Sequence, residues 1–476
     1  MRKRILFIIL SFTLLLSLFG CVTTHPPHTQ STQPSVTTQS TTWPTSLPTT
    51  FPSTLPTTFP TTEPTTAPTT FPTTFPTTLP TTFPTTLPTT LPPTVPTTQP
   101  TVPPVPAEML WTPICQEYIT MRATPGGSRI GIIPVNATVT VEKWYWNYAL
   151  VVYNDLKGYV QSNFLKPADK NYISNQLQAV TLSEWYTYEQ MLKDIAELQQ
   201  LYPNTVHVSS IGKSELGRDL PVLQVGDLNA KYHVLMHASI HGREYFTSCL
   251  TMAILDFSLA RGMASDVCYH IIPMVNPDGV AISQAQTLNS AQEAIYLQDI
   301  AAGYTNYRMS TYAQLWKANA LGVDLNRNFS SGWEYCDDRS GPSSEKYQGT
   351  APFSAAETKA LRDYTLQYDF DATFSFHSSG DVIFYQFGSR QPVNQLSLSL
   401  AKAVQAVNGY DILSSGEDKT NGAGYKDWAM DELGIPSLTI EVGCNDAPLP
   451  NQEIYNAFYR FENFMPAVNA WLRENA

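Results

Sequence analysis

The C-terminal part of the sequence, about residues 180–476, predicts an α/β domain in which helices cover both faces of a largely parallel sheet. One observation is an apolar helical pattern from Glu189 to Leu201, which Pro203 ends. A second is a series of short apolar runs further along, at residues 221–225, 233–236, 270–275, 372–376 and 437–442. Short buried strands between helices are typical of sheets covered on both sides.

Residues 107–168 predict a small all-β unit. Three β-branched or aromatic runs are separated by turn signals, at residues 118–122, 138–142 and 149–153. The order of landmarks, including Met121-Arg122, Ile132-Ile133-Pro134 and Gly158-Tyr159-Val160, resembles the bacterial SH3-like domain. Such domains bind cell-wall peptide or glycan, or act as spacers. The residues Trp144, Tyr145 and Trp146 form either a ligand platform or part of the core.

The stretch from residue 22 to 106 repeats Phe-Pro-Thr-Thr or Leu-Pro-Thr-Thr. Proline at this density is incompatible with helices and sheet ladders and favours extended polyproline II. We therefore expect a disordered Thr/Pro linker that acts as a semi-rigid spacer.

The first 21 residues are typical of an export signal. Three basic residues at positions 2–4 precede an apolar run that ends at Gly20-Cys21. This end resembles a bacterial lipobox, which implies lipid attachment at Cys21 and an extracellular protein anchored to the bacterial cell membrane. The alternative is ordinary signal cleavage, with Cys21 incidental.

Charge and cysteine content limit the function further. The formal net charge is −12 and no basic run is present, which argues against nucleic-acid binding. None of the six cysteines has CxxC-type spacing, so the sequence predicts no cysteine metal site.

Metal-ligand residues stand at the ends of predicted strands. His241 and Glu244 follow the run 233–236, and His377 follows the run 372–376. Strand ends gather functional groups at one edge of a sheet. Zn²⁺ accepts imidazole nitrogen and carboxylate oxygen, and catalytic zinc sites use three protein ligands. Taken alone, His241 and Glu244 are equally typical of a surface pair.

Two further strings complete this group. Glu441 lies inside an apolar run. Burying a carboxylate there costs free energy unless the group has a catalytic role or an interaction partner. Asn326-Arg327 offers an amide and a guanidinium suited to binding a carboxylate. The strand-associated histidines outside this group are interpreted as core or supporting residues: His233, His237 and His270.

In this order, the sequence motifs that contain these residues resemble the zinc carboxypeptidase family of the carboxypeptidase A type, over about residues 186–471. The resemblance implies a mixed eight-stranded sheet with helices on both faces. It implies one Zn²⁺ per chain, held by His241, Glu244 and His377. It also implies that Glu441 is the general base and acid, and that three residues hold the terminal carboxylate of the substrate: Arg243, Asn326 and Arg327.

Three positions depart from the family pattern. Lys317 stands where the family has an arginine that stabilises the oxyanion, so it is the candidate catalytic cation. It has the positive charge of an arginine but not the paired N–H donors of a guanidinium group. The mobile tyrosine of the family falls at Lys419, and Tyr425 is the candidate to replace it. Lys426 occupies a pocket position and, if it points inward, favours a negatively charged substrate.

The strings at residues 316–320 and 424–428 look most like those of bacterial γ-D-glutamyl-diaminopimelate peptidases. We therefore expect a metallocarboxypeptidase that hydrolyses peptide bonds near a C-terminal carboxylate in the stem peptides of peptidoglycan, which muropeptides carry. The SH3-like domain would bind the cell wall. Two alternatives stay open: a broad scavenging carboxypeptidase acting on ordinary peptides, and a catalytically inactive wall-binding surface protein.

Overall fold

The computed structural model describes residues 110–114, 117–145, 147–169, 176–183, 185–336, 338–416, 422–450 and 453–476. Several predictions fall outside these residues and stay predictions: the signal segment with Cys21, the Thr/Pro linker, and the positions of Trp146 and Lys419. Within the described ranges, no helix is both long enough and apolar enough to cross a membrane.

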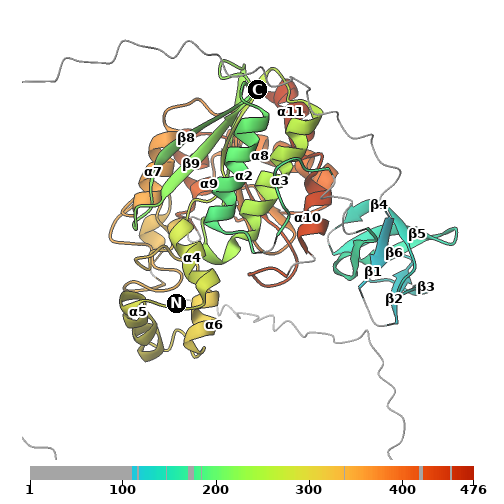
Figure 1. Ribbon diagram of the computed structural model, residues 1–476, viewed down its shortest axis with the longest axis horizontal. Coiled ribbons are helices and arrows are strands. Elements are labelled where there is room, and N and C mark those ends of the chain that lie inside the picture. Colours follow the sequence, from blue (N-terminus) through green and yellow to red (C-terminus); the bar gives the residue numbers. More distant parts are fainter. Residues whose placement is uncertain are drawn as a thin grey trace, which may run out of the picture. The chain divides into compact units, whose positions relative to one another are not determined.

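The C-terminal domain is built on an eight-stranded mixed sheet, as predicted (Figure 1). The strand order is β14-β13-β15-β12-β10-β11-β9-β8. At its centre, β10 pairs in parallel with β11 and β12, and β12 pairs in parallel with β15. Antiparallel pairings join β9 to β8 and β11, and β13 to β15. The bounds are β8 Val206–Lys213, β9 Asp219–Val225, β10 Tyr232–Ala238, β11 Val267–Ile272, β12 Ala372–His377, β13 Val382–Phe384, β14 Asp411–Leu413 and β15 Ser437–Glu441.

Helices cover both faces of this sheet because its central strands are apolar on both sides. Along β10, for example, Val234 and Met236 belong to one hydrophobic cluster and Leu235 belongs to another. The first cluster includes residues of α2 Tyr188–Leu201, α3 Phe246–Arg261, α8 Gln391–Asn408, α10 Glu453–Phe461 and α11 Phe464–Asn475. The second includes residues of α7 Ala356–Thr365 and α9 Tyr425–Trp428. Three further helices lie between β11 and β12 in the chain: α4 Pro277–Ala285, α5 Ser290–Ala301 and α6 Met309–Gln314.

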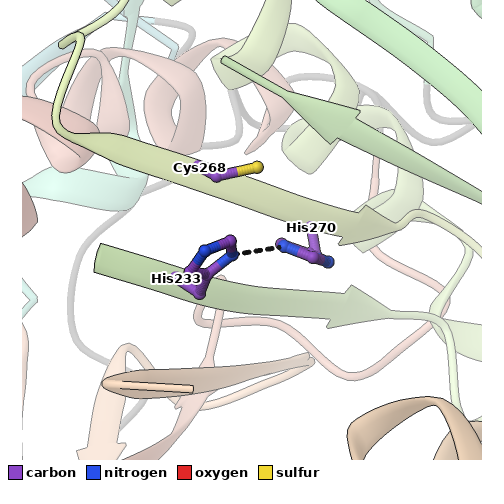
Figure 2. Close-up of side chains that lie close together, drawn as sticks. All are labelled: His233, Cys268 and His270. Atoms are coloured by element: carbon purple, nitrogen blue, oxygen red, sulfur yellow. Dashed lines mark hydrogen bonds between the residues drawn. The ribbon is translucent and has the colours of Figure 1, made fainter. Parts of the chain in front are cut away.

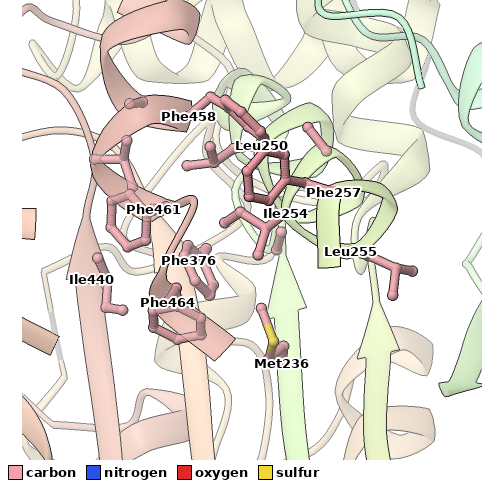
Figure 3. Close-up of a cluster of buried hydrophobic side chains, with 14 of the residues drawn as sticks. Met236, Leu250, Ile254, Leu255, Phe257, Phe376, Ile440, Phe458, Phe461 and Phe464 are labelled. Carbon is pink, nitrogen blue, oxygen red and sulfur yellow. The ribbon is translucent and has the colours of Figure 1, made fainter. Parts of the chain in front are cut away.

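An aromatic cluster joins the sheet to the C-terminal helices. Figure 3 shows Phe376 of β12 close to Phe461 and Phe464. The ring centroid of Phe464 lies 5.6 Å from that of Phe376 and 5.8 Å from that of Phe461. All three rings are almost completely buried, so they hold α10 and α11 against the sheet.

Helix α2 begins one residue before the predicted start. The side chain of Thr187 accepts a hydrogen bond from the backbone of Gln190 and so caps the helix. The apolar residues of this pattern are Met191, Leu192, Ile195, Leu198 and Leu201. Three of them are buried, whereas Leu192 and Leu201 are about 40% exposed. The apolar stripe is therefore narrower than the sequence pattern indicated.

Residues 110–167 form a separate seven-stranded sheet in the order β3-β2-β6-β5-β4-β1-β7. All the pairings described in it are antiparallel. The all-β prediction is confirmed, and the SH3-like assignment stays a prediction. The bounds are β1 Leu110–Pro113, β2 Tyr118–Arg122, β3 Arg129–Pro134, β4 Val139–Tyr145, β5 Tyr148–Tyr153, β6 Leu156–Gln161 and β7 Leu165–Pro167.

Trp144 belongs to the core rather than to an exposed platform. Its side chain is buried, and its ring lies edge-on to that of Trp111 at a centroid distance of 4.9 Å. Tyr145 is half-buried against Tyr159. Of the two interpretations of this aromatic run, the structure supports the core for Trp144.

Candidate active site

The candidate metal ligands meet at the carboxyl edge of the sheet. His377 is the last residue of β12 and Glu441 the last of β15, and the two are partners in the strand register. His241 follows β10 by three residues and precedes a short helical turn, Gly242–Glu244. Because β10, β12 and β15 are parallel, their ends bring these four side chains to one place.

A close contact between two backbone segments sets the position of His241. A Cβ atom on Gly242 would lie 2.4 Å from the carbonyl carbon of Gly279, so only glycine fits. The side-chain amide nitrogen Nδ2 of Asn276 donates to the carbonyl oxygens of Ile240 and Lys317, at 3.2 and 3.1 Å. These contacts join the His241 turn to the segment that carries Lys317.

Glu244 lies between the two histidines. Its Oε1 is 2.8 Å from His241 Nδ1, and its Oε2 is 3.1 Å from His377 Nδ1. Ligands of a tetrahedral zinc ion at about 2.0–2.2 Å are themselves roughly 3.3 Å apart. The ligand atoms of the three residues lie within 4.8 Å of one another, and all three side chains are buried. The donor set and its spacing therefore fit Zn²⁺.

Carboxylates lie close to the candidate histidine ligands. His241 Nε2 lies 3.2 Å from Asp324 Oδ1, so three carboxylates gather here: Glu244, Asp324 and Glu441. Burial alone would lower the pKa of His241, but Glu244 and Asp324 raise it to about 9. Burial raises the pKa of Glu441, and His377 opposes this shift. A divalent cation held by the two histidines and Glu244 would be attracted by these carboxylates.

The predicted cationic and amide residues surround this group. The charge of half-buried Lys317 acts on His241, Asp324 and Glu441, which places its ammonium group near the candidate metal ligands. In the described part of the chain, the Nε atoms of Arg243 and Arg327 are buried without a hydrogen-bond partner.

Asn326 is fixed by its neighbours. It accepts a hydrogen bond from the backbone of Tyr425 through Oδ1, at 3.2 Å. Its own backbone N–H donates to Asp324 Oδ1 at 3.1 Å. The Asn326-Arg327 pair is therefore held beside the same carboxylate that contacts His241.

Tyr425 does not lie where the sequence led us to expect. Its ring is completely buried, 4.5 Å from that of His237, and its hydroxyl lies 3.2 Å from Thr365 Oγ1. Burial raises the pKa of this phenol. The side chain has no exposed surface in this structure, and the substrate-binding role of Tyr425 stays a prediction.

Lys426 points into the protein, where its ammonium group is held by two partners. Nζ donates to Asp427 Oδ1 at 2.6 Å and to the carbonyl oxygen of Gln386 at 2.9 Å. The side chain is only 5% exposed. An ammonium group has three donors, so these contacts engage two of them.

Two residues of the site had no role assigned from the sequence. Asp324 orients His241 through Nε2, and Asn276 holds the loops on either side of the His241 turn. Asp324 lies two residues before Asn326-Arg327 in the sequence. This proximity to a predicted site pair was the sequence feature that could have identified Asp324 as a site residue. His237 is confirmed as a core residue, with Nε2 at 2.8 Å from Ser375 Oγ.

Comparisons with known proteins agree with this geometry. A family model described as zinc carboxypeptidase matches residues 191–466. Gamma-D-glutamyl-L-diamino acid endopeptidase 1 of Lysinibacillus sphaericus is 33% identical over 285 residues, which are 56% of this chain and 68% of that protein. Carboxypeptidase B of Astacus astacus is 27% identical over 282 residues, 55% of this chain and 86% of that protein.

A solved structure extends the similarity to the fold. Thrombin activatable fibrinolysis inhibitor gives a TM-score of 0.50 at 21% identity, covering 68% of this chain and 90% of that chain. The matched family segment contains the His/Glu/His donor set and covers more than half of the chain. The chain therefore belongs to the zinc carboxypeptidase family and is a metal-dependent peptide hydrolase with one catalytic zinc.

Proposed function

We propose that this protein cleaves a peptide bond next to a C-terminal carboxylate in peptidoglycan stem peptides. The observation that carries the proposal is the convergence of His241, Glu244 and His377 beside Glu441 at one sheet edge. The relative from Lysinibacillus sphaericus, whose name describes a γ-D-glutamyl-L-diamino acid endopeptidase, supports the substrate class.

In this proposal, His241, Glu244 and His377 hold the zinc ion. A zinc ion held by these residues would supply Lewis-acid chemistry to the scissile carbonyl group and to the attacking water. Glu441 takes a proton from the attacking water and passes it to the leaving amine. Its burial raises its pKa, which suits a group that must hold that proton between the two steps. Lys317 places a positive charge close to the oxygen on which negative charge develops.

Three side chains would bind the terminal carboxylate of the substrate: Arg243, Asn326 and Arg327. The buried Nε atoms of Arg243 and Arg327 lack partners among the described residues, so a bound carboxylate would satisfy donors that are otherwise unpaired. Holding this carboxylate would position the scissile bond over the metal and give the enzyme its preference for chain ends.

The Lys426 ammonium group is an argument for a substrate that carries an acidic group. Diaminopimelate in stem peptides carries a carboxylate on its side chain, which lysine in the same position lacks. Asp427 and Gln386 engage two donors of the Lys426 ammonium group, and we propose that the third binds this carboxylate. In Lys426→Met, the preference for diaminopimelate over lysine peptides should fall by about 10- to 100-fold, the equivalent of one hydrogen bond to a charged group.

We further propose that the enzyme works outside the cell, tethered by lipid at Cys21. The proposal rests on the signal-like segment ending at Gly20-Cys21 and on the Thr/Pro repeat that follows it. The small β-domain would then bind the wall close to the substrate. Labelling with a lipid precursor, with Cys21→Ala as the unlabelled control, tests this part independently of catalysis.

Mass spectrometry of muropeptides and ordinary peptides incubated with the purified protein tests the function. We expect cleavage of muropeptides, and in Glu441→Gln a loss of about 10²- to 10⁴-fold in rate with zinc retained. Glu462→Gln makes the same chemical change beside Arg261 at the far end of α3, and should stay active. Trimming of ordinary peptides with muropeptides untouched would favour a scavenging enzyme, and absence of both zinc and turnover would favour an inactive wall-binding protein.

A further inference from the structure

A second group of metal-ligand side chains lies between the central strands, away from the active site. Figure 2 shows His233 on β10 beside Cys268 and His270 on β11. His233 is the register partner of Cys268, and His270 follows two residues later on the same face of β11. His233 precedes the end of β10 by five residues, or roughly 17 Å at about 3.3 Å per residue. The group is therefore distinct from the catalytic metal centre.

The distances within this group suit a metal ion. His233 Nδ1 lies 3.0 Å from His270 Nε2, and one ligand atom from each of the three residues lies within 4.8 Å of the others. Tetrahedral Zn²⁺, with Zn–N of about 2.0–2.1 Å and Zn–S of about 2.3 Å, separates two nitrogens by roughly 3.3 Å and nitrogen from sulfur by roughly 3.6 Å. Shifts of about 1 Å or less would bring all three atoms onto one ion.

A neighbouring side chain orients His270 for this purpose. His270 Nδ1 lies 2.7 Å from the hydroxyl of Tyr364 on α7. If Nδ1 carries the proton and donates it to this hydroxyl, Nε2 presents its lone pair towards His233. Histidine ligands of metals are commonly held in this way by a hydrogen bond to the other ring nitrogen.

The group is buried on one side and accessible on the other. Cys268 and His270 are completely buried. Zinc binds neutral imidazole and thiolate, so its affinity for this group should strengthen as the pH rises. His233 is half-buried and provides access from the solvent.

We propose that His233, Cys268 and His270 bind a second Zn²⁺ ion, which cross-links β10 and β11. Two imidazoles and one thiolate form a donor set that selects zinc over hard cations such as Mg²⁺. The proposed site goes beyond the single catalytic zinc and differs from the expectation from cysteine spacing, because its ligands come from two strands rather than from one motif. Since β10 leads to His241, the ion would stabilise the strand that positions the catalytic ligands.

Metal analysis of the full-length protein, equilibrated with zinc and desalted, tests the proposal. We expect about two zinc ions per chain in the wild type and about one in Cys268→Ala and in His233→Ala, both with peptidase activity retained. Cys249→Ala is the matched control, because Cys249 is an equally buried thiol on α3 outside the group, and it should keep about two ions. One zinc per chain in both the wild type and Cys268→Ala would overturn the proposal.

Cobalt substitution gives a second readout that does not depend on activity. A Co²⁺-loaded protein with the catalytic ligands removed, His241→Ala/His377→Ala, should still show a thiolate-to-cobalt charge-transfer band. The band should vanish when Cys268→Ala is added and persist when Cys249→Ala is added. No such band in the catalytic-site double variant, shown to be folded by circular dichroism, would also overturn the proposal.

Discussion

Replacing Asp324 by asparagine tests how the metal centre is assembled. The side chain is only 4% exposed and accepts three hydrogen bonds. Its Oδ1 lies 3.2 Å from His241 Nε2 and accepts from the backbone of Asn326 at 3.1 Å, while Oδ2 accepts from the backbone of Lys346 at 2.8 Å. Aspartate serves all three donors because both of its oxygens are acceptors.

In Asp324→Asn, one of these acceptors becomes a donor. If the amide oxygen faces Lys346, the NH₂ group faces His241 Nε2, which must then be unprotonated. His241 Nδ1 consequently carries the proton and cannot bind zinc. If the amide turns the other way, the buried N–H of Lys346 loses its partner, at a cost of about 1–3 kcal/mol.

We expect the zinc affinity of Asp324→Asn to fall by about 10- to 100-fold, or about 1.4–2.7 kcal/mol. Competition with a chelator measures this affinity directly. Asp299→Asn is the control, because Asp299 is a buried carboxylate that accepts from Tyr312 and Ser343 instead of from a metal-site histidine. Equal affinity in Asp324→Asn and the wild type would refute the role of Asp324, as would an equal loss in Asp299→Asn.

Three further predictions concern the fold around the site. Tyr425→Phe should keep turnover within about twofold and cost about 0.5–1.5 kcal/mol of stability, because its hydroxyl lies against Thr365; a large drop in kcat would contradict its buried position. Phe464→Ala should cost about 3–5 kcal/mol in urea unfolding, and a loss below about 1 kcal/mol would show that the cluster in Figure 3 is not tightly packed. Burial raises the pKa of Glu357 from 4.5 to about 7, so the folded state favours its protonated form and stability should fall as pH rises through this window. Glu357→Gln should flatten that part of the urea-midpoint profile, and an unchanged slope would count against the assignment.

Local sequence patterns identified part of the fold. Apolar periodicity identified α2, and short apolar runs identified five of the eight strands of the large sheet, because burial on a regular helix or strand imposes a regular spacing. The parallel strand ends also made it predictable that His241, Glu244 and His377 would meet, since these ends share one edge of the sheet.

Tertiary structure decided where side chains in irregular segments point. The adjacent residues Tyr425 and Lys426 have different surroundings: the Tyr425 ring packs into the core, and the Lys426 ammonium group is held by Asp427 and Gln386 with two of its three donors engaged. Their orientations depend on contacts with residues distant in the chain, such as Thr365 and Gln386.

The same reason explains the groups that only the structure revealed. Asp324 meets His241 across 83 residues, and His233 meets His270 across 37. No spacing in the chain encodes such a pair, because it arises from strand register and from the loops that follow the strands. The sequence by itself therefore determined the fold class, the central strands, helix α2 and the candidate zinc ligands. Only tertiary packing decided which side chains lie beside those ligands, which are buried in the core, and which come together as a second candidate group of metal ligands.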